Sequence, residues 1–397
     1  MARPLLALVL LLSACAISPT ATPIPTVDPT ASPSPSTVPS PTPEPGLTWS
    51  RVPDAPALHV VGVGAGNGMR DVVAGGPGFV AVGAGYENDA SFAAAWTSVD
   101  GVTWERVPHT SDFDGMGMFA VEAGGPGFVA VGGGCCPDRA AVWTSGDGRS
   151  WARVPSSPSF DNASIHKVVP WERGLLAIGC EAFTECAGTL LMASADGLTW
   201  NRIPAAAFHD ALIFDAAAGG PGLVAVGFRC PPGGGIAGDC YARPAVWVSG
   251  DGVSWSDVPL NDAASGYLSA VASGAAGFVA FGDESEGLPR SVVTLRTSPD
   301  GLAWARVPTP DVFADARVSA VRAVGGAFFA LGQRGGEEPI PTIWRSVDGL
   351  DWTIVLEGSP ADSGSLSDLA TDGTRLVAVG ETYPSAGAMV WTRPAAP

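Results

Sequence analysis

A heptapeptide of the form Ser-x-Asp-Gly-x-x-Trp recurs down most of this 397-residue chain. Its tryptophans are residues 104, 151, 200, 255, 304 and 352, so successive copies lie 47, 49, 55, 49 and 48 residues apart. A period in this range is typical of repeats that each form one four-stranded blade of a β-propeller. The repeat therefore constrains the architecture more strongly than any other feature of the sequence.

Within one repeat, residues 116–155, short apolar runs alternate with Gly, Pro and Asp-Gly, as in strands joined by tight turns. We expect strands at 118–123, 128–132, 140–145 and 150–154. The connections between the first two strands and between the last two are rich in glycine, which supplies the positive φ of a tight hairpin. Each repeat is therefore predicted to form four strands, with no room for a helix in either of these two turns.

The second strand of this pattern occurs seven times, at 79–83, 128–132, 175–179, 223–227, 278–282, 328–332 and 376–380. The heptapeptide occurs six times, because at Trp391 a third strand stops just before its turn. Residues 48–53 (TWSRVP) match the fourth strand of the other repeats. We therefore predict an all-β, seven-bladed β-propeller whose N-terminal strand completes the C-terminal blade. Such closure leaves no free sheet edge, and we expect a monomer.

The first residues predict export. Arg3 precedes an apolar run, residues 5–12, that is too short to span a bilayer and is typical of a secretory signal. Leu12-Ser13-Ala14-Cys15 resembles the lipobox of bacterial lipoproteins, which implies that Cys15 is lipidated; ordinary cleavage at the small residues around Cys15 is the alternative. We expect a signal peptide at 1–15, a disordered tether rich in Pro, Ser and Thr at 16–46, and the propeller at 47–397. The protein would then be anchored by lipid to the outer leaflet of the cytoplasmic membrane or to the cell surface.

The charge balance argues against several functions. The 21 basic and 39 acidic residues give a formal charge of −18, which disfavours nucleic-acid binding. Lys167 is the only lysine, so the chain has no Gly-Lys-Ser/Thr phosphate loop, and no serine stands between glycines as in a nucleophile elbow. The four histidines share no metal-ligand spacing.

Six cysteines besides Cys15 fall in loops that follow the second strands of three consecutive blades. An even number in an exported chain predicts disulfides. We expect one staple between Cys180 and Cys186 and another between Cys230 and Cys240. The adjacent Cys135 and Cys136 leave three alternatives open, namely a strained vicinal disulfide, a bridge to a neighbouring loop, or free thiols.

Loops of variable length all belong to one face of the predicted propeller, which we expect to be the binding face. An acid precedes the innermost strand in six blades; six acids around the channel mouth would suit calcium or a basic partner. The alternative is that Asp is there because it favours turns. We expect no other cofactor and no metal. The candidate residues of this face are Tyr86, Glu87, Asp114, Asp161, Asp210, Tyr241, Asp262, Tyr267, Asp315, Asp362 and Tyr383.

Ser98 to Trp104 (SVDGVTW) resembles the Asp-box, or BNR, repeat of bacterial sialidases and related propellers, although it is one residue shorter. The resemblance implies a turn device on the face away from the active site, and so specifies fold rather than function. Sialidases are six-bladed and use an arginine triad, a tyrosine with a glutamate partner, and an acid/base aspartate; no matching motif places these residues here. We expect structural roles for the aspartates of the six copies, Asp100, Asp147, Asp196, Asp251, Asp300 and Asp348.

Two functions remain open. The first is a tethered, non-catalytic propeller that binds a protein, a peptide or a glycan through its acidic loop face. The second is a sialidase-like or other glycoside hydrolase that uses two loop carboxylates about 5 to 10 Å apart. The sequence assigns no catalytic residue, and we favour binding.

Overall fold

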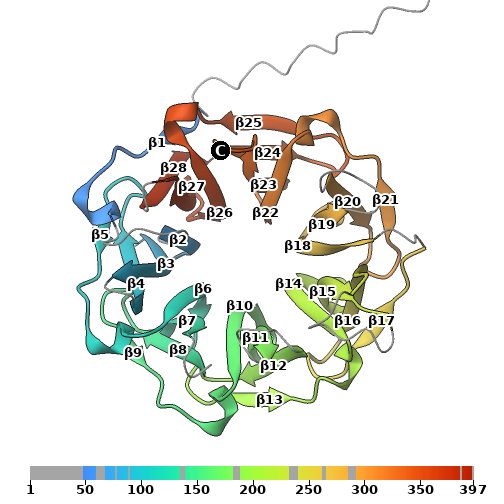
Figure 1. The fold of residues 1–397 in the computed structure, drawn as a ribbon, viewed down its shortest axis with the longest axis horizontal. Coiled ribbons are helices and arrows are strands. Elements are labelled where there is room, and N and C mark those ends of the chain that lie inside the picture. Colours follow the sequence, from blue (N-terminus) through green and yellow to red (C-terminus); the bar gives the residue numbers. More distant parts are fainter. Residues whose placement is uncertain are drawn as a thin grey trace, which may run out of the picture. The chain divides into compact units, whose positions relative to one another are not determined.

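The computed structural model of the chain describes residues 48–59, 68–76, 78–87, 90–134, 139–181, 188–231, 240–261, 265–284, 292–384 and 387–395. The chain divides into two units, residues 1–42 and 43–397, and all described residues belong to the second. In this part of the chain, every extended strand belongs to one of seven four-stranded antiparallel sheets arranged around a central axis (Figure 1).

The blades are named in chain order, with their strands given from the axis outward. Blade 1 comprises β2 (Gly68–Gly75), β3 (Gly78–Glu87), β4 (Ala90–Ser98) and β5 (Glu105–Arg106); blade 2 comprises β6 (Gly117–Gly124), β7 (Gly127–Gly134), β8 (Arg139–Ser145) and β9 (Ala152–Arg153). Blade 3 comprises β10 (Ala163–Trp171), β11 (Gly174–Glu181), β12 (Gly188–Ser194) and β13 (Asn201–Ile203); blade 4 comprises β14 (Ala211–Gly219), β15 (Gly222–Arg229), β16 (Arg243–Ser249) and β17 (Ser256–Val258). Blade 5 comprises β18 (Gly266–Gly274), β19 (Gly277–Glu284), β20 (Val292–Ser298) and β21 (Ala305–Val307); blade 6 comprises β22 (Ala316–Val324), β23 (Ala327–Arg334), β24 (Ile340–Ser346) and β25 (Thr353–Glu357). Blade 7 comprises β26 (Gly364–Thr371), β27 (Arg375–Thr382), β28 (Ala388–Pro394) and, outermost, β1 (Ser50–Arg51).

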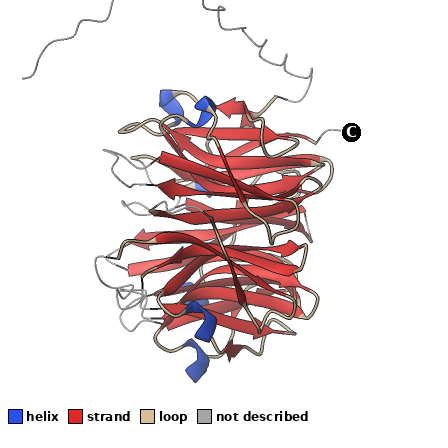
Figure 2. Cartoon of the chain, turned by 90° about the vertical axis from the view of Figure 1, so that its right-hand side faces the viewer, coloured by secondary structure: helices blue, strands red, loops and turns tan. Residues whose placement is uncertain are grey.

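The N-terminal strand closes the ring. Ser50 pairs with Thr392 and Arg51 pairs with Trp391, so β1 is the fourth strand of blade 7. The seven blades and this closure confirm the fold predicted from the repeat. Figure 2 shows the strands running between two faces of the propeller. On the turn face lie the hairpins that join first to second and third to fourth strands, including all six heptapeptide turns; on the loop face lie the connections from second to third strands and from each blade to the next.

The heptapeptide forms a turn locked by its aspartate. Asp100 Oδ1 accepts hydrogen bonds from the backbone N–H groups of Val102 at 2.8 Å and Thr103 at 2.6 Å. Gly101 has φ = 69°, a left-handed conformation that glycine adopts without a steric cost. The indole of Trp104 donates to the Gly101 carbonyl at 3.3 Å. The pKa of Asp100 is lowered, chiefly by the hydrogen bond from the Thr103 backbone, so its carboxylate is ionised and serves as an acceptor within the turn.

Aromatic side chains fill the space between blades. In five blades a tryptophan of the third strand pairs with an alanine of the second strand, as Trp96 pairs with Ala81. Trp96, Trp143, Trp247 and Trp344 are completely buried there. Two blades depart from this pattern: blade 3 has Met192 and blade 5 has Arg296.

Single-turn 3-10 helices precede the innermost strand of six blades, and an arginine of the same blade holds most of them in place. Arg106, Arg153 and Arg202, all on fourth strands, donate to carbonyls of these turns at 3.1, 2.8 and 2.7 Å. In blade 4 the fourth strand carries Asp257 instead, and Arg229 of the second strand donates to the His209 carbonyl at 2.9 Å. The recurrent arginines are therefore structural. The six turns are η1 (Pro56–Leu58), η2 (Ser111–Phe113), η3 (Pro158–Phe160), η4 (Ala206–Phe208), η5 (Asp311–Phe313) and η6 (Pro360–Asp362).

Candidate functional site: the mouth of the central channel

A β-bulge interrupts the innermost strand of every blade at the same place. The register of β2 with β3, for example, passes from Met69 to Asp71 and skips Arg70. A bulge adds one residue to a strand and re-aims the side chains beside it. The seven residues at the bulges, here called the bulge ring, all line one cavity of about 150 Å³ in the channel. They are Arg70, Phe119, His166, Phe214, Ser269, Ser319 and Ser367.

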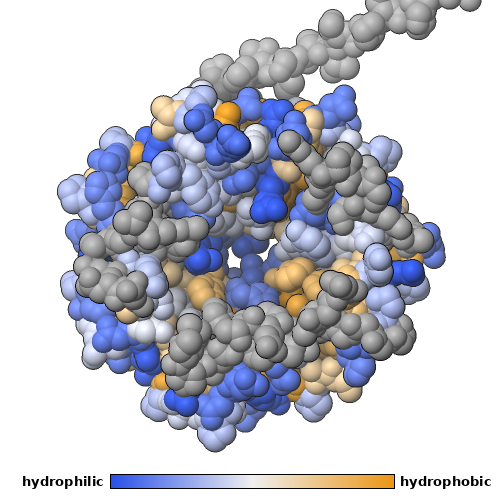
Figure 3. Space-filling view, in the orientation of Figure 1, coloured by the Kyte–Doolittle hydropathy of each residue, from blue (hydrophilic) through white to orange (hydrophobic). Residues whose placement is uncertain are grey.

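The bulge ring is divided into two halves. Blades 2, 3 and 4 contribute Phe119, His166 and Phe214, which form an aromatic wall, whereas blades 5, 6 and 7 contribute three serines. Blade 1 contributes Arg70, whose guanidinium lies 5.2 Å from the centre of the Phe119 ring. Figure 3 shows apolar colour beside the central hollow over β6 and β14, and a polar surface elsewhere around it. Above the ring the channel widens into a mouth of about 520 Å³ on the loop face.

Two tyrosine–carboxylate pairs lie near the bulge ring, where Tyr267 packs 5.6 Å from Phe214 and the charge of Arg70 acts on Tyr383. The Tyr267 hydroxyl donates to Asp283 Oδ2 at 2.7 Å, and the Tyr383 hydroxyl donates to Glu381 Oε1. Burial first, and then the hydrogen bond, raises the pKa of each phenol to about 12, so both are protonated at neutral pH. Arg317 is close enough to both tyrosines for its charge to act in the opposite direction.

Below the bulge ring, the channel contains buried charges that pair across blades. Lys167 Nζ lies 3.2 Å from Asp215 Oδ1, and Arg322 Nη2 lies 2.6 Å from Asp368 Oδ1. Burial lowers the pKa of Lys167, but the carboxylates around it outweigh burial and the net shift is upward. Each of these two cations therefore has a carboxylate partner within the protein.

Three of the channel carboxylates also hold neighbouring blades together. Asp71 accepts a hydrogen bond from the Val121 N–H of blade 2 at 2.9 Å, and Asp215 accepts one from the Val271 N–H of blade 5 at 3.0 Å. Burial, and then the nearby Asp368 carboxylate, raises the pKa of Asp71 well above its usual range. At Asp368 burial is again the largest influence and acts upward, but the Arg322 guanidinium, the hydrogen bond with Asp71 and the charge of Lys167 together outweigh it, and the pKa is lowered.

Burial shifts the pKa of two further channel residues toward the uncharged form. Burial lowers the pKa of His166 to about 4, so its imidazole is neutral and bonds the Ile213 carbonyl at 3.1 Å. Burial also raises the pKa of Glu122 to about 7. Glu122 belongs to a cavity of about 270 Å³ at the turn-face end, which it shares with Arg322. Sequence reasoning missed this channel set, although charged residues at a repeat position that elsewhere holds alanine were a usable signal.

The acids expected to surround the mouth lie elsewhere. Asp114 pairs with His109 at 2.8 Å, Asp161 with Arg139 at 2.9 Å, Asp210 with His209 at 2.9 Å, and Asp362 with Arg51. Asp315 lies in a crevice between blades 5 and 6. None of these five lines the three channel cavities. Asp262 and the Glu87 side chain lie outside the described part.

The four candidate tyrosines divide into two groups. Tyr267 and Tyr383 form the two hydrogen-bonded pairs near the bulge ring. Tyr86 and Tyr241 are solvent-facing, with 41% and 80% of their surface exposed. Tyr241 directly follows Cys240, which forms a disulfide with Cys230. This disulfide confirms one of the two expected staples.

Cys180 is also disulfide-bonded, whereas Cys135, Cys136 and Cys186 lie outside the described residues. Among the residues that the structure describes, no cluster of three or more His, Cys, Asp or Glu side chains is arranged to hold a metal ion. No helix within the described ranges is long and apolar enough to cross a bilayer.

Fold and site together define a seven-bladed β-propeller with a polar channel and a half-aromatic mouth. No protein-family profile matches the chain, and no curated protein matches it. Among solved structures, the BP39L lectin from Burkholderia pseudomallei is similar at 15% identity and a TM-score of 0.52, covering 82% of this chain and 96% of the lectin. A Trypanosoma rangeli sialidase solved with the inhibitor DANA is similar at 13% identity and a TM-score of 0.45, covering 87% of this chain and 59% of the sialidase. The β-propeller domain of the Trilobed protease from Pyrococcus furiosus aligns at 10% identity and a TM-score of 0.46, covering 83% of this chain and 94% of that domain. These likenesses concern the fold.

Proposed function

We propose that this chain is an exported, lipid-anchored binding module that takes a glycan into the mouth of its channel without cleaving it. The observation that carries the proposal is the divided bulge ring. A sugar ring has apolar C–H faces, which pack against aromatic rings, and hydroxyl edges, which exchange hydrogen bonds with serine and arginine. The aromatic wall of Phe119, His166 and Phe214 can pack against the C–H face of a sugar, and the serines on the other half of the ring can bond its hydroxyls. The neutral imidazole of His166 adds no charge to repel such a ligand.

The path of the chain supports presentation of this mouth away from the membrane. Fourth strands follow the heptapeptide turns, so they run from the turn face toward the loop face. β1 is a fourth strand, and the residues that precede Ser50 therefore join the propeller on its turn face. The chain therefore enters the propeller on the face opposite the mouth.

A protein or peptide ligand is the competing outcome for the same face. Tyr241 is the observation in its favour, because an exposed tyrosine on a backbone fixed by the Cys230–Cys240 disulfide is a typical interface anchor. Its backbone is held further where Ala242 donates to the Cys240 carbonyl at 2.9 Å. The glycan is preferred because the mouth, unlike Tyr241, is a concave site.

The test is a glycan-array screen of the full-length protein in detergent. Phe214→Ala and Phe119→Ala should each weaken binding of the hits by about tenfold or more, since aromatic anchors commonly contribute more than 1 kcal/mol. Leu198→Ala is the matched control, because Leu198 is 50% exposed on the turn face. Array binding that both phenylalanine variants retain would overturn the proposal. Capture of an envelope protein that depends on Tyr241, with no array hit, would establish the competing outcome.

A glycoside hydrolase is the second candidate, and the two tyrosine–carboxylate pairs near the bulge ring favour it. Phenols with a pKa near 12 are poor nucleophiles until a partner removes the proton, and Asp283 and Glu381 are placed to do so. Fluorogenic glycosides, including sialosides, with and without calcium, provide the test. Turnover that disappears in Tyr383→Phe or Tyr267→Phe would establish the hydrolase, whereas the proposed binding module shows no turnover.

A further inference from the structure

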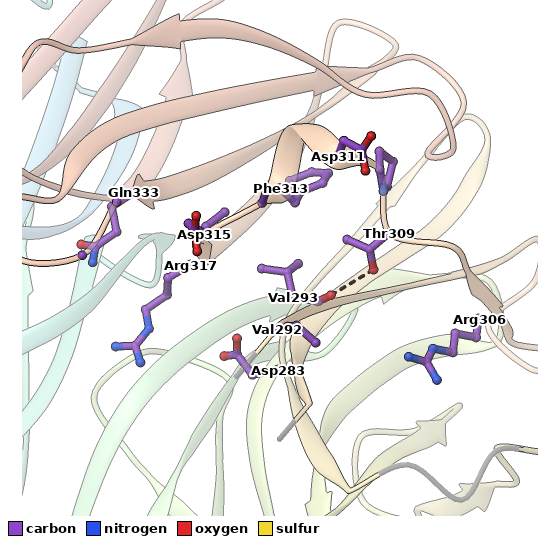
Figure 4. Close-up of a pocket in the computed structure, with 15 residues that line it drawn as sticks. Asp283, Val292, Val293, Arg306, Thr309, Asp311, Phe313, Asp315, Arg317 and Gln333 are labelled. Atoms are coloured by element: carbon purple, nitrogen blue, oxygen red, sulfur yellow. Dashed lines mark hydrogen bonds between the residues drawn. The ribbon is translucent and has the colours of Figure 1, made fainter. Parts of the chain in front are cut away.

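A second cavity lies outside the channel, in the crevice between blades 5 and 6. Its volume of about 720 Å³ falls within the range of about 300 to 1,000 Å³ that is usual for small-molecule sites. Figure 4 shows the side chains that line it, with Arg306 at one end, Arg317 at the other, and Val292, Val293 and Phe313 between them. The crevice therefore offers an apolar wall with polar groups around it.

Blade 5 departs from the repeat beside this crevice. Where five other blades bury a tryptophan, blade 5 buries Arg296, which is only 1% exposed. The buried carboxylate of Glu284 lies 3.7 Å from Arg296 and is hydrogen-bonded to Arg306 on its other side. Exchanging a buried aromatic ring for paired charges brings a desolvation cost that packing alone does not explain. Departures of this kind from an internal pattern are expected at functional sites.

The fourth-strand arginine of blade 5, Arg306, also has a different partner from its equivalents in other blades. Arg106, Arg153 and Arg202 use the equivalent fourth-strand position to hold the 3-10 turn of their own blade. Arg306 instead bonds Glu284 and lines the crevice, with 48% of its side chain exposed. A repeated structural arginine has thus become part of a cavity wall.

The polar groups of the crevice are available to a ligand. Asp315 and Arg317 lie two residues apart near the start of β22 and are both exposed, and the side chain of neither forms a hydrogen bond or an ion pair with any described residue. The side chains of Asp311 and Gln333, on the same cavity, likewise have no partner in the described part of the chain. Unpaired donors and acceptors therefore converge on one space.

The charges of the crevice select the class of ligand. Arg306 is neutralised by Glu284, and Asp283 already accepts the Tyr267 hydroxyl. The charged groups of the crevice without an internal partner among the described residues are then the carboxylates of Asp311 and Asp315 and the guanidinium of Arg317. The two carboxylates would repel an anionic ligand, and the guanidinium would repel a cationic one. Neighbouring hydroxyls of a sugar each donate and accept, which matches a carboxylate and a guanidinium side by side.

We propose that the crevice between blades 5 and 6 binds a neutral saccharide. The inference rests on the proposed function in one respect, since both assign glycan binding to the loop face, but it concerns a separate cavity. Tyr267 connects the two places: it bonds Asp283 of the crevice and packs 5.6 Å from Phe214 of the bulge ring. An oligosaccharide seated in the crevice is therefore directed toward the mouth.

The experiment is isothermal titration of the full-length protein with maltotriose, cellotriose, mannotriose and chitotriose as probes. Asp315→Asn removes the acceptor charge and should lower the affinity for the best probe by about tenfold, as for a lost hydrogen bond to a charged group. Asparagine tolerates the left-handed backbone at this position, where φ is 52°, so the turn is preserved. Asp311→Asn is the second variant and should act in the same direction.

Asp210→Asn is the matched control, because Asp210 has φ = 55° before the innermost strand of blade 4 and does not line the crevice. Unchanged affinity in Asp315→Asn and Asp311→Asn, or no binding of any of the four probes, would overturn the crevice site. Loss of binding in Phe214→Ala alone would place the saccharide in the mouth, which rejects the crevice and supports the proposed function.

Discussion

The carboxylate of Asp368, in the last blade, accepts a hydrogen bond from the backbone N–H of Val72, in the first blade, at 3.2 Å. The ring is thus closed twice. At the rim, β1 pairs with β28; at the axis, Asp368 joins blade 7 to blade 1. The same carboxylate pairs with Arg322 of blade 6, so one side chain connects three consecutive blades.

Replacement of Asp368 by alanine is predicted to weaken this closure. The change leaves the buried Arg322 without its partner and the Val72 N–H without an acceptor, and loss of one member of a buried pair costs about 3 to 5 kcal/mol. Guanidinium unfolding followed by tryptophan fluorescence measures the free energy of unfolding. Asp351→Ala, at an exposed position, should change it by no more than about 0.5 kcal/mol. A loss below about 1 kcal/mol in the Asp368 variant would show that the axial contact does not hold the ring.

Stability is predicted to fall as the pH rises from about 5 to 7. Burial raises the pKa of Glu122 from 4.5 to about 7, so the folded state binds a proton that the unfolded state has lost in this range. The stabilisation that the Glu122 proton contributes is complete below the unfolded pKa and is lost as the pH rises through the folded pKa. It amounts to at most about 3 kcal/mol. Solvent screening reduces it, because the side chain is partly exposed. Lys167 and Arg322 oppose the shift, whereas Asp368 adds to it. Denaturant titrations across this range should show a flatter profile in Glu122→Gln, and an identical slope in both proteins would contradict the assignment.

Gly101→Ala is predicted to destabilise the seam between blades 7 and 1. Gly101 has φ = 69°, and an added Cβ would lie 2.6 Å from Val377 Cγ2. The left-handed conformation alone costs alanine about 1 to 2 kcal/mol. Gly188→Ala is the control, because a Cβ there meets nothing within 4 Å. Thermal unfolding of both variants gives the comparison, and equal midpoints would be inconsistent with a required glycine at position 101.

Removal of the Cys230–Cys240 disulfide is predicted to lower stability. The bond closes a loop over a sequence separation of 10, and cross-links of this length restrict the unfolded chain by about 2 to 3 kcal/mol. The double variant Cys230→Ser, Cys240→Ser should therefore unfold at lower denaturant concentration than the parent. Dithiothreitol should shift the parent more than the variant; an equal shift in both would assign the effect to other cysteines.

The sequence predicted the blades because a period of nearly 50 residues and glycine-rich turns are local signals. It did not predict the bulges, because one extra residue in a strand leaves the apolar pattern almost unchanged. The pair His166 and Lys167 shows the consequence: both face the channel, although strict alternation would place them on opposite sides. The mouth was therefore invisible as a site until the seven strands were brought together.

The turn acids show a different limit of sequence reasoning. Asp210 and Asp315 have φ values of 55° and 52°, a conformation in which aspartate is favoured over most residues. Backbone geometry accounts for their presence before an innermost strand. Arg296, in contrast, was readable from the sequence, because it stands where the repeat requires tryptophan.

The most direct test of glycan binding at the mouth is the dissociation constant of an array-selected glycan for the full-length protein and for the double variant Phe119→Ala, Phe214→Ala. We predict at least about a tenfold weaker affinity in the variant, from loss of the aromatic wall, and an intact glycan by mass spectrometry after prolonged incubation. Equal affinities would remove the mouth as the binding site. A cleaved glycan would replace the binding module with an enzyme.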